Sequence, residues 1–373
     1  MIAIERHAQT ELLAAEWDAL VDSTRASPFA RPGWIAAWAA AFAPRRLEVL
    51  AARRDGRLEG VLAVRRGGAG MRAAANAHTP HFEVLGSDTV VVRRLVDELY
   101  AQRPRSVTLA YLDPTAPGWA AALAGGRAAG YRLATRVVVR SPCVTVVGEH
   151  DAYLRTRRRS FLADLRRRRR RLEESGAVTF EACAGGQRAG PLLEELLALE
   201  AAGWKAARGT AIAARASTQR FYAAVTAWAA ARGTLRLLAL RVAGRPLAAL
   251  LGVEEDGVLY LLKGGFDPVY ARYSPGQLVL AQTIERAFAD GLRRVELGAG
   301  ADPYKLQWAD AVHDLVGMSA FAPSAAGSLG WIAVARGRPL AQRAGVDRAL
   351  RPVRDRVLAA SELMRRGGQR QGR

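Results

Sequence analysis

Cysteine and histidine are scarce in this sequence of 373 residues, which has two cysteines and five histidines. Neither Cys143 nor Cys183 lies in a CxxC or similar spacing, so no pattern for a zinc site or a disulfide framework is present. We expect both to be small buried residues rather than nucleophiles, in a reducing compartment. The sequence also lacks a Gly-x-Ser-x-Gly motif and a Ser/His/Asp order. We therefore expect neither a bound metal nor a covalent enzyme intermediate.

Long apolar runs are also missing. The first residues, MIAIERHAQTELLAAEW, carry charges where a signal peptide needs an apolar segment. No segment approaches the ~20 consecutive apolar residues of a membrane-spanning helix. The expected location is the cytoplasm, with any membrane contact confined to the surface of the protein.

The composition is otherwise that of a folded protein. Half of the residues are hydrophobic, which is enough for a full core, and a chain of this length favours two domains. The formal net charge is +20, from 55 Lys and Arg against 35 Asp and Glu. Such an excess favours anionic partners such as phosphate-bearing cofactors, anionic lipid or nucleic acid. A solvated surface in an arginine-rich composition explains the charge equally well.

Two halves of similar order follow from the apolar periodicity and the turn residues. In the first half we expect helices at 11–21, 33–43, 89–103 and 117–129, a hairpin around Asp55-Gly56, and strands at 106–112 and 131–140, the second ended by Ser141-Pro142. In the second half we expect helices at 150–175, 190–207, 216–232 and 274–290, with strands at 177–182, 235–266 (three), 293–298 and 316–322. This order predicts a mixed α/β fold with antiparallel hairpins. The predicted division is a domain at 1–145, a second at 146–323, and a basic helical appendage at 324–373.

The stretch from Leu259 to Trp308 contains the strongest site signals. A predicted strand ends in Gly264-Gly265, where a ligand or another backbone can approach closely. Ser274 is the predicted N-cap of the following helix, with Pro275 at its first position. Free N–H groups and the positive end of the helix dipole make this helix start a candidate phosphate site. Ordinary helix capping explains the same residues.

A second polar cluster follows the next predicted strand. Acyl transfer to an amine needs a base for the amine proton and a donor for the leaving group. Glu296 or Asp302 can act as the base, and Tyr304 as the acid. The alternative is that Glu296 pairs with a neighbouring arginine and that the Tyr304 hydroxyl lies in water.

The segments FDPVYARYSPG and GLRRVELGAGADPYK resemble the GNAT-fold acetyltransferase-like family that is associated with cellulose or exopolysaccharide biosynthesis. That family is similar to the Fem-type aminoacyltransferases of peptidoglycan synthesis, which contain two GNAT-like domains. The resemblance covers most of the chain and is densest at 260–305. It also includes Trp34, Trp38 and Phe42, then Asn76-x-His78-x-Pro80, Gly203-Trp204-Lys205 and Phe221-Tyr222.

The resemblance implies tandem GNAT-like domains with a substrate cleft in the second. The cleft would be lined by Trp204, Lys205, Tyr260, Lys263, Asp267, Tyr270, Tyr273 and Ser274, with Glu296, Asp302, Tyr304 and Lys305 as a second cluster. From the helix start we expect Gly276 and Gln277 at the donor site, and we expect Asn76 and His78 on a loop that borders the cleft. The sequence departs from the family at Glu296, where an aspartate is usual, and at Phe266, where an aromatic hydroxyl is usual. The familiar pyrophosphate loop Q/R-x-x-G-x-G/A is absent, which leaves acyl donors other than acetyl-CoA open.

The basic segment from Arg155 to Arg171 holds ten arginines and one acidic residue. Its apolar residues recur at helical spacing, so the arginines are expected on the remaining faces. The segment can bind the phosphates of a donor, contact anionic lipid, or form a solvated face. Without interleaved aromatic residues it does not predict sequence-specific binding of nucleic acid.

Two functions are consistent with these patterns. The first is an N-acyltransferase that moves an acyl group from an acyl-CoA-like donor to an amine of a small molecule or glycan precursor, such as an amino sugar. The second is a non-catalytic binding or assembly component that recognises a polyanion or an anionic membrane. Peripheral membrane contact would use the basic helix at 155–171 or the C-terminal tail.

Overall fold

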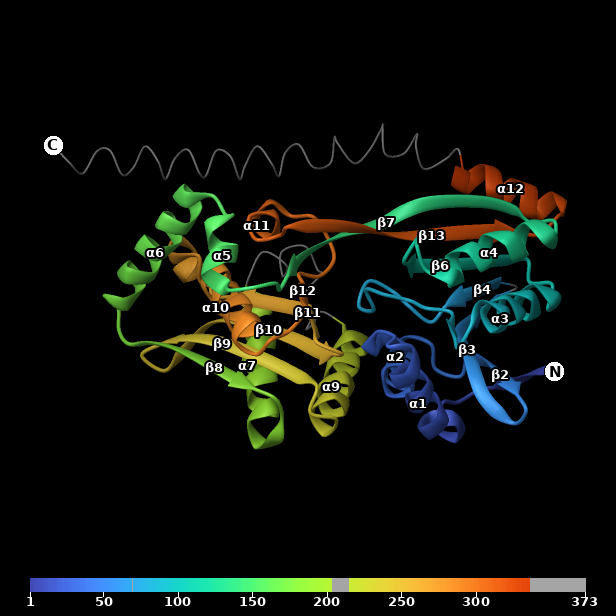
Figure 1. Ribbon diagram of the computed structural model, residues 1–373, viewed down its shortest axis with the longest axis horizontal. Helices are drawn as coiled ribbons and strands as arrows, with labels where there is room; N and C mark the ends of the chain where they lie inside the picture. Colours follow the sequence, from blue (N-terminus) through green and yellow to red (C-terminus); the bar gives the residue numbers. More distant parts are fainter. Residues whose placement is uncertain (69, 203–214, 336–373) are drawn as a thin grey trace.

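A computed structural model describes residues 1–68, 70–202 and 215–335. Its centre is a 13-stranded mixed sheet that runs through both halves of the chain (Figure 1). The strands are β1 (Ile2–His7), β2 (Leu47–Arg54), β3 (Arg57–Gly67), β4 (Gly70–Ala73), β5 (Leu85–Gly86), β6 (Ser106–Leu112), β7 (Arg132–Thr145), β8 (Val178–Cys183), β9 (Leu235–Val242), β10 (Arg245–Glu255), β11 (Val258–Phe266), β12 (Arg294–Glu296) and β13 (Ala311–Phe321). Their order is β1-β2-β3-β4-β6-β13-β7-β12-β11-β10-β9-β8, with β5 paired to β3.

The helices cover this sheet in two groups (Figure 1). The first half contributes α1 (Ala14–Thr24), α2 (Pro32–Phe42), α3 (Thr89–Ala101), α4 (Pro117–Ala128) and the short 3-10 helices η1 (Glu11–Leu13) and η2 (Pro28–Ala30). The second contributes α5 (His150–Arg155), α6 (Arg159–Glu173), η3 (Gly186–Arg188), α7 (Ala189–Ala202), α9 (Ala216–Ala231), η5 (Pro268–Tyr273), α10 (Pro275–Ala289), α11 (Pro303–Leu306) and α12 (Ala325–Ala335). Most predicted elements are confirmed within a few residues.

The Asp55-Gly56 turn shows why the hairpins were predictable. Both residues have positive φ, 52° and 81°, which Asp and Gly tolerate better than other residues. The turn joins β2 to β3 in antiparallel register, with Arg54 opposite Arg57. The same chemistry at Asp256-Gly257 joins β10 to β11.

β7 does not end at Ser141-Pro142, as the sequence pattern predicted, but continues to Thr145. Pro142 has no N–H, yet its carbonyl accepts a hydrogen bond from Leu297 N at 3.0 Å, on the side of β12. Regular pairing with β12 covers only Cys143 to Thr145. Pro142 is thus accommodated at the point where the regular pairing of β7 with β12 has ended.

β13 returns from the second half of the sequence to the sheet of the first half. It pairs antiparallel with β6 and, along eleven residues from Ala311 to Phe321, with β7. Figure 1 shows β7 and β13 running together from one half of the molecule to the other. The two halves therefore share strands, and the predicted division at residue 145 stays a prediction.

The predicted helix at 150–175 is two helices, α5 and α6, and this expectation was wrong. Between them the chain turns at Thr156, whose hydroxyl donates to Tyr153 O at 2.7 Å. The Arg157 side chain folds inward and donates to the carbonyls of Trp308 and Ala309 at 2.8 and 2.7 Å. These contacts hold the chain at the break between the two helices and so favour the break over a continuous helix.

One of the hydrophobic core clusters is built from apolar residues of both halves. α2 packs against α9, and Trp34 makes edge contacts with Phe221 and Trp228, whose ring centroids lie 5.5 and 6.1 Å away. Gly33 is required here, because a Cβ at this position would lie 2.1 Å from the Trp228 ring. The halves are thus held together by interior-like packing.

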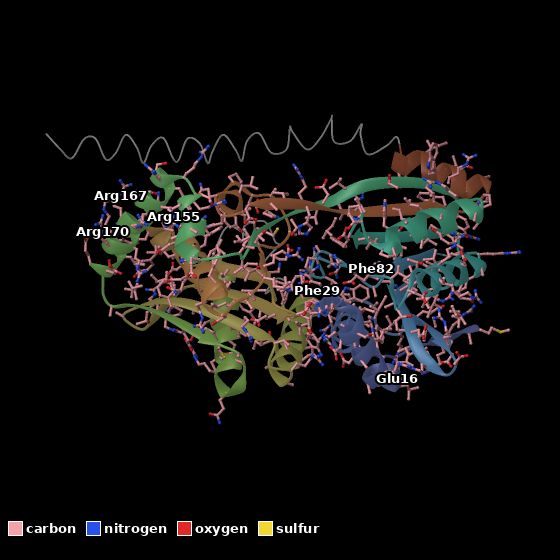
Figure 2. The ribbon with its side chains drawn as sticks, in the orientation of Figure 1. Glu16, Phe29, Phe82, Arg155, Arg167 and Arg170 are labelled. Carbon is pink, nitrogen blue, oxygen red and sulfur yellow. The ribbon has the colours of Figure 1, made fainter. Side chains whose placement is uncertain are left out.

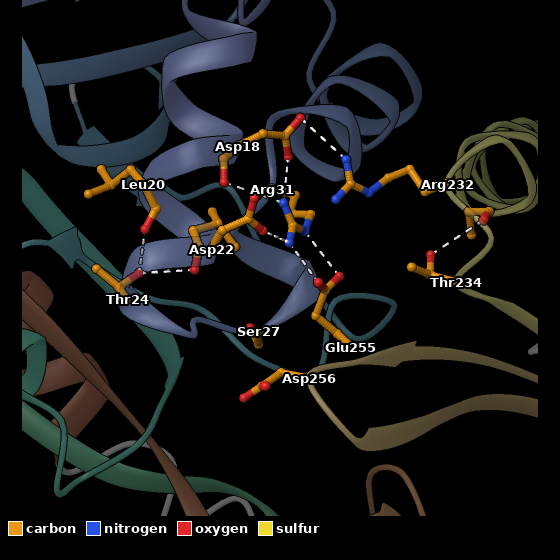
Figure 3. Close-up of polar contacts among 12 residues, drawn as sticks. Asp18, Leu20, Asp22, Thr24, Ser27, Arg31, Arg232, Thr234, Glu255 and Asp256 are labelled. Carbon is orange, nitrogen blue, oxygen red and sulfur yellow. Dashed lines mark hydrogen bonds and ion pairs between the residues drawn. The ribbon is translucent and has the colours of Figure 1, made fainter. Parts of the chain in front are cut away.

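A buried arginine adds a polar connection between the halves (Figure 3). The side chain of Arg31, at the start of α2, is 2% exposed and contacts three carboxylates. Asp18 and Asp22 belong to α1, whereas Glu255 lies at the end of β10 in the second half. Arg31 therefore ties the helices of the first half to the β10–β11 hairpin.

Among residues 1–68, 70–202 and 215–335, every helix is too short or too polar to cross a membrane. The predicted appendage at 324–373 is described only as far as α12, and its remainder lies outside the described residues.

Candidate functional site

A cavity of about 800 Å³ lies between the two halves of the molecule. Its walls come from η2 and the loop before β5, from the ends of β6 and β10, and from the middle of the sheet at β7, β11, β12 and β13. The polar side chains that line it are those of Arg25, Ser27, His81, Glu83, Asp113, Thr115, Ser141, Cys143, Thr145, Glu255, Asp256, Tyr260, Arg293, Arg294, Glu296, His313 and Asp314. Its size fits a small-molecule substrate.

Glu296 reaches this cavity from the last residue of β12. It lies opposite Tyr260 of β11 in parallel register and opposite Cys143 of β7 in antiparallel register. Pairing between β11 and β12 ends at this position, although β11 continues to Phe266. β12 itself ends at Glu296, and the carboxylate of this residue is placed by regular strands on both sides.

The Glu296 carboxylate is 6% exposed and has three polar neighbours. Arg294 Nε lies 2.9 Å from Oε1, whereas Ser141 Oγ donates to Oε2 at 3.4 Å and His313 Nε2 lies 3.6 Å from Oε2. Burial raises the pKa of Glu296 above 4.5, and the nearby His313 and Arg294 oppose the rise. A carboxylate with a raised pKa is a stronger base than one in water.

A second acid–base group faces the same cavity from the first half. His81 Nδ1 lies 3.2 Å from Glu83 Oε1 and 3.4 Å from Ser27 Oγ. Burial opposes charge on both groups, but their mutual contact raises the pKa of His81 and lowers that of Glu83. The Ser27 hydroxyl donates to Glu83, and His81 Nδ1, the nitrogen that contacts Glu83, is also the one nearest to Ser27. His81 and Glu83 therefore form an ion pair, and Ser27 is not arranged as a nucleophile that a histidine activates.

The predicted site residues fall into four separate places. Tyr260 and Glu296 line the cavity. Burial raises the pKa of the Tyr260 hydroxyl above its ordinary value, so Tyr260 stays a neutral phenol. In the part of the chain that the structure describes, the cavity lining includes neither Asp302 nor Tyr304.

The start of α10 holds a second set of predicted residues. Pro275 opens the helix as expected, but the Ser274 side chain makes no capping bond and instead accepts a hydrogen bond from Arg168 Nη1 at 2.5 Å. The N–H groups of Gln277 and Leu278 already donate to Ser274 O. The Gly276 N–H precedes these two and is the candidate donor to an anion at this helix start, where Arg168 contacts Ser274.

α11 packs next to this helix start. Gln277 Nε2 donates to Tyr304 O at 3.3 Å, and the Trp308 indole donates to Gln277 Oε1 at 2.6 Å. Tyr304 is 51% exposed. Lys305 is buried and donates to the carbonyls of Gly298 and Ala299 at 3.2 and 2.7 Å, with Asp302 at 3.7 Å. Lys305 thus holds the turn after β12.

Two further sets lie away from the cavity. Asp267 starts η5 by accepting from Val269 N at 3.0 Å and pairs with Arg245 at 2.7 Å; Tyr270 and Tyr273 follow in the same element. His78 lies against Phe42, with ring centroids 5.5 Å apart. The remaining contacts of this set are His78 Nδ1 with the Tyr222 hydroxyl at 3.2 Å, the Asn76 side chain with His78 N at 2.9 Å, and Lys263 Nζ over the Tyr222 ring at 5.7 Å.

The close approach that we expected at Gly264-Gly265 is made by another segment of the protein, the helix α7. A Cβ on Gly265 would lie 2.6 Å from Glu200 N, so the backbone of α7 occupies this space. The predicted cleft residues Trp204 and Lys205 lie outside the described residues.

Comparison with known proteins finds a family match in the second half. Residues 159–306 match the acetyltransferase (GNAT) domain. This part of the chain is therefore similar to a GNAT domain. The match supports the expected acyltransferase, and the expected mixed α/β fold of the GNAT type is confirmed. No curated protein matches the chain.

Solved structures share the fold of nearly the whole chain. FemX is 11% identical, with a TM-score of 0.57 over 89% of this chain and 100% of its own. The C-terminal domain of a protein assigned as a lysylphosphatidylglycerol synthetase, from Agrobacterium fabrum, is 13% identical, with a TM-score of 0.55 over 87% of this chain and 96% of its own. A conserved protein from Bacteroides thetaiotaomicron is 12% identical, with a TM-score of 0.53 over 86% and 100%. At these identities the likeness concerns the fold alone.

Several cavity residues were not among the sequence predictions. His313 of β13 lies opposite Ser141 of β7, and Cys143 opposite Glu296 of the GNAT domain. The register of three strands that are distant in sequence brings these side chains together, and no local motif carries that information. The alternative interpretation of Glu296 had a local signal, because Arg294 precedes it by two residues and therefore shares its face of the strand.

The basic helix lies at the opposite end of the GNAT domain from the cavity. Figure 2 shows Arg155, Arg167 and Arg170 at the outer end of the molecule, far from Phe29 and Phe82 at its centre. Arg167 pairs with Asp164, whereas Arg168 reaches the start of α10. The role of this surface in binding stays a prediction.

Proposed function

We propose that this protein transfers an acyl group from an acyl thioester, such as an acyl-CoA, to an amine bound in the central cavity. The observation that carries the proposal is the buried Glu296 side chain, which lies at the end of β12, beside β11, and lines the 800 Å³ cavity. The match of residues 159–306 to an acetyltransferase domain supports the reaction class.

In the proposed reaction the amine nitrogen attacks the acyl carbonyl directly. A C–N bond forms, the C–S bond of the thioester breaks, and Glu296 accepts the proton that the nitrogen loses. The thiolate leaves with the donor and takes a proton from solvent or from an acid of the protein. Tyr304 stays a candidate for that acid, and Asp302 a candidate for a second base. Donor phosphates would bind at Gly276, near Arg168.

The acceptor is proposed to be a small amine or a glycan precursor that carries an amino group. The cavity supports this class, because Glu83, Asp113, Glu255, Asp256, Glu296 and Asp314 line it together with Arg25, Arg293 and Arg294. Most of these carboxylates already have a cationic partner, such as Glu255 with Arg31 and Asp256 with Arg293. Their oxygens can accept further hydrogen bonds, so an amine in the cavity would meet acceptors on several sides.

The test is thiol release from acyl-CoA thioesters in the presence of a panel of amines that includes amino sugars. We expect Glu296→Gln to reduce turnover by about 10²-fold or more, as removal of a general base does. Asp314→Asn is the matched control, because Asp314 also lines the cavity but is 41% exposed and pairs with Arg140. It should retain turnover within about threefold, a change too small to indicate a role in proton transfer.

A thermal-shift series separates this proposal from the non-catalytic alternative. An acyl-CoA should raise the melting temperature of the wild-type protein, and Gly276→Asp should abolish the rise by placing a negative charge at the start of α10. Absence of any thioester response, together with salt-sensitive binding to anionic vesicles, would reject the acyltransferase and favour a membrane-binding component. Turnover that is equal in Glu296→Gln and wild type would remove Glu296 as the base.

A further inference from the structure

Three side chains with metal-binding atoms meet on the cavity face of the sheet. Cys143, Glu296 and His313 come from the neighbouring strands β7, β12 and β13. One ligand atom of each residue lies within 4.8 Å of the other two. Thiolate, carboxylate and imidazole are the ligand types that Zn²⁺ takes in proteins.

The strand register explains why these side chains share a face. Cys143 is directly opposite Glu296 on one side and opposite Ala311 on the other. His313 lies two residues beyond Ala311, and residues two apart in a strand point to the same face. All three side chains are therefore held by a rigid sheet rather than by loops, which favours a defined binding geometry.

The separation of Glu296 and His313 fits an ion between them. His313 Nε2 lies 3.6 Å from Glu296 Oε2, which is too long for a hydrogen bond. Two ligand atoms at about 2.1 Å from a tetrahedral Zn²⁺ lie about 3.4 Å apart. A small movement of the Cys143 side chain brings its sulfur to the third position, about 3.6 Å from each of the other two atoms.

The surroundings leave Glu296 Oε2 directed at this position. Arg294 occupies the other oxygen, Oε1, at 2.9 Å, and Ser141 donates to Oε2 at 3.4 Å. A carboxylate oxygen accepts more than one partner, so these contacts orient the ligand as second-layer hydrogen bonds do in metal sites. The cavity beside the cluster leaves a fourth position for water.

We propose that Cys143, Glu296 and His313 bind a Zn²⁺-class divalent ion. The ion takes the thiolate form of Cys143, and the thiol proton passes to solvent. The proposed ion binds the same oxygen that would accept the amine proton, so its binding blocks acyl transfer; this consequence rests on the proposed function, whereas the binding itself does not.

Cobalt(II) is the probe for this site, because its spectrum reports the ligands directly. Titration of the whole protein with Co²⁺ should produce visible ligand-field bands of a four-coordinate ion and a near-ultraviolet charge-transfer band from the thiolate, and one equivalent of Zn²⁺ should displace both. Cys143→Ala should remove the charge-transfer band. Cys183→Ala is the matched control, because Cys183 is also buried and free but lies on β8, away from the cluster; it should retain the full spectrum.

His313→Ala should weaken Co²⁺ binding by tenfold or more without unfolding the protein, because the His313 side chain is 39% exposed. A Co²⁺ spectrum without a thiolate band, or one that Cys143→Ala leaves unchanged, would overturn the proposal whether or not the protein transfers acyl groups. In the active protein, Zn²⁺ should inhibit wild type and spare Cys143→Ala. Inhibition that is equal in both would show that Zn²⁺ acts elsewhere.

Discussion

Arg31 provides a direct test of how the two halves are held together. Its guanidinium contacts Asp18 at 2.8 Å, Asp22 at 2.5 Å and Glu255 at 2.6 Å, and its own side chain is 2% exposed (Figure 3). Removing one partner of a buried charge cluster costs about 3–5 kcal/mol, because the remaining charges are left unpaired. Asp22 is 64% exposed and Asp18 31% exposed, so water compensates them in part. We expect Arg31→Met to lower the free energy of unfolding by about 3 kcal/mol.

The measurement is urea unfolding, followed by tryptophan fluorescence and by circular dichroism. Arg232→Met is the control, because Arg232 also pairs with Asp18, at 3.5 Å, but is 30% exposed; it should cost about 1 kcal/mol or less. The double variant Arg31→Met/Glu255→Gln should be less destabilised than the sum of the single variants. A loss in Arg31→Met no larger than in Arg232→Met, or strict additivity with Glu255→Gln, would refute the role of Arg31 as a buried connection.

Three further outcomes follow from the described contacts. Burial raises the pKa of Glu296, and only the ionised carboxylate can act as a base. We therefore expect kcat/KM to rise with pH through an apparent pKa above 4.5. A kcat/KM that does not change from pH 4 to 8 would contradict this. Burial lowers the pKa of His78 from 6.5 to about 4, so His78 is protonated at a higher pH in the unfolded chain than in the folded protein. The free energy of unfolding of the wild type should therefore decrease as the pH falls from about 6.5 to 4. Urea titrations at several pH values should show a smaller decrease for His78→Gln. Gly265→Ala should lower the free energy of unfolding by about 1–3 kcal/mol, because the added Cβ would lie 2.6 Å from Glu200 N. Gly276→Ala is the control, since its added Cβ would have no neighbour closer than 3.6 Å, and its loss should be less than half as large. Calorimetry measures both losses.

Local chemistry explains which parts of the fold were predictable. The turn at Asp55-Gly56 and the helix start at Pro275 depend on residues adjacent in sequence, and both lie where the sequence predicts. The break between α5 and α6 depends on Arg157 finding the carbonyls of residues 308 and 309, which are distant in sequence. Helical periodicity contains no information about such a partner, so the continuous helix was the natural but wrong expectation.

The candidate site divides in the same way. Glu296 was predicted because a carboxylate that ends a strand before a Gly-rich turn is visible locally. His313 was not, since its place depends on the register of β13 against β7. His78 and His81 occupy one loop, yet His78 packs among aromatic rings and His81 lines the cavity. Tertiary packing decided between the two histidines, and the loop sequence does not distinguish them.

The return of β13 to the first half has a consequence for the order of events during synthesis. Until residues 311–321 have left the ribosome, β6 and β7 each lack the neighbour that separates them in the finished sheet. Both strands then present an open edge while the GNAT domain is still being made, and open edges invite pairing with other chains. The cavity, which takes His313 from the same late strand, is completed only at that point. A nascent chain stopped before β13 should therefore bind holdase chaperones and lack the site, however well its first 145 residues have collapsed.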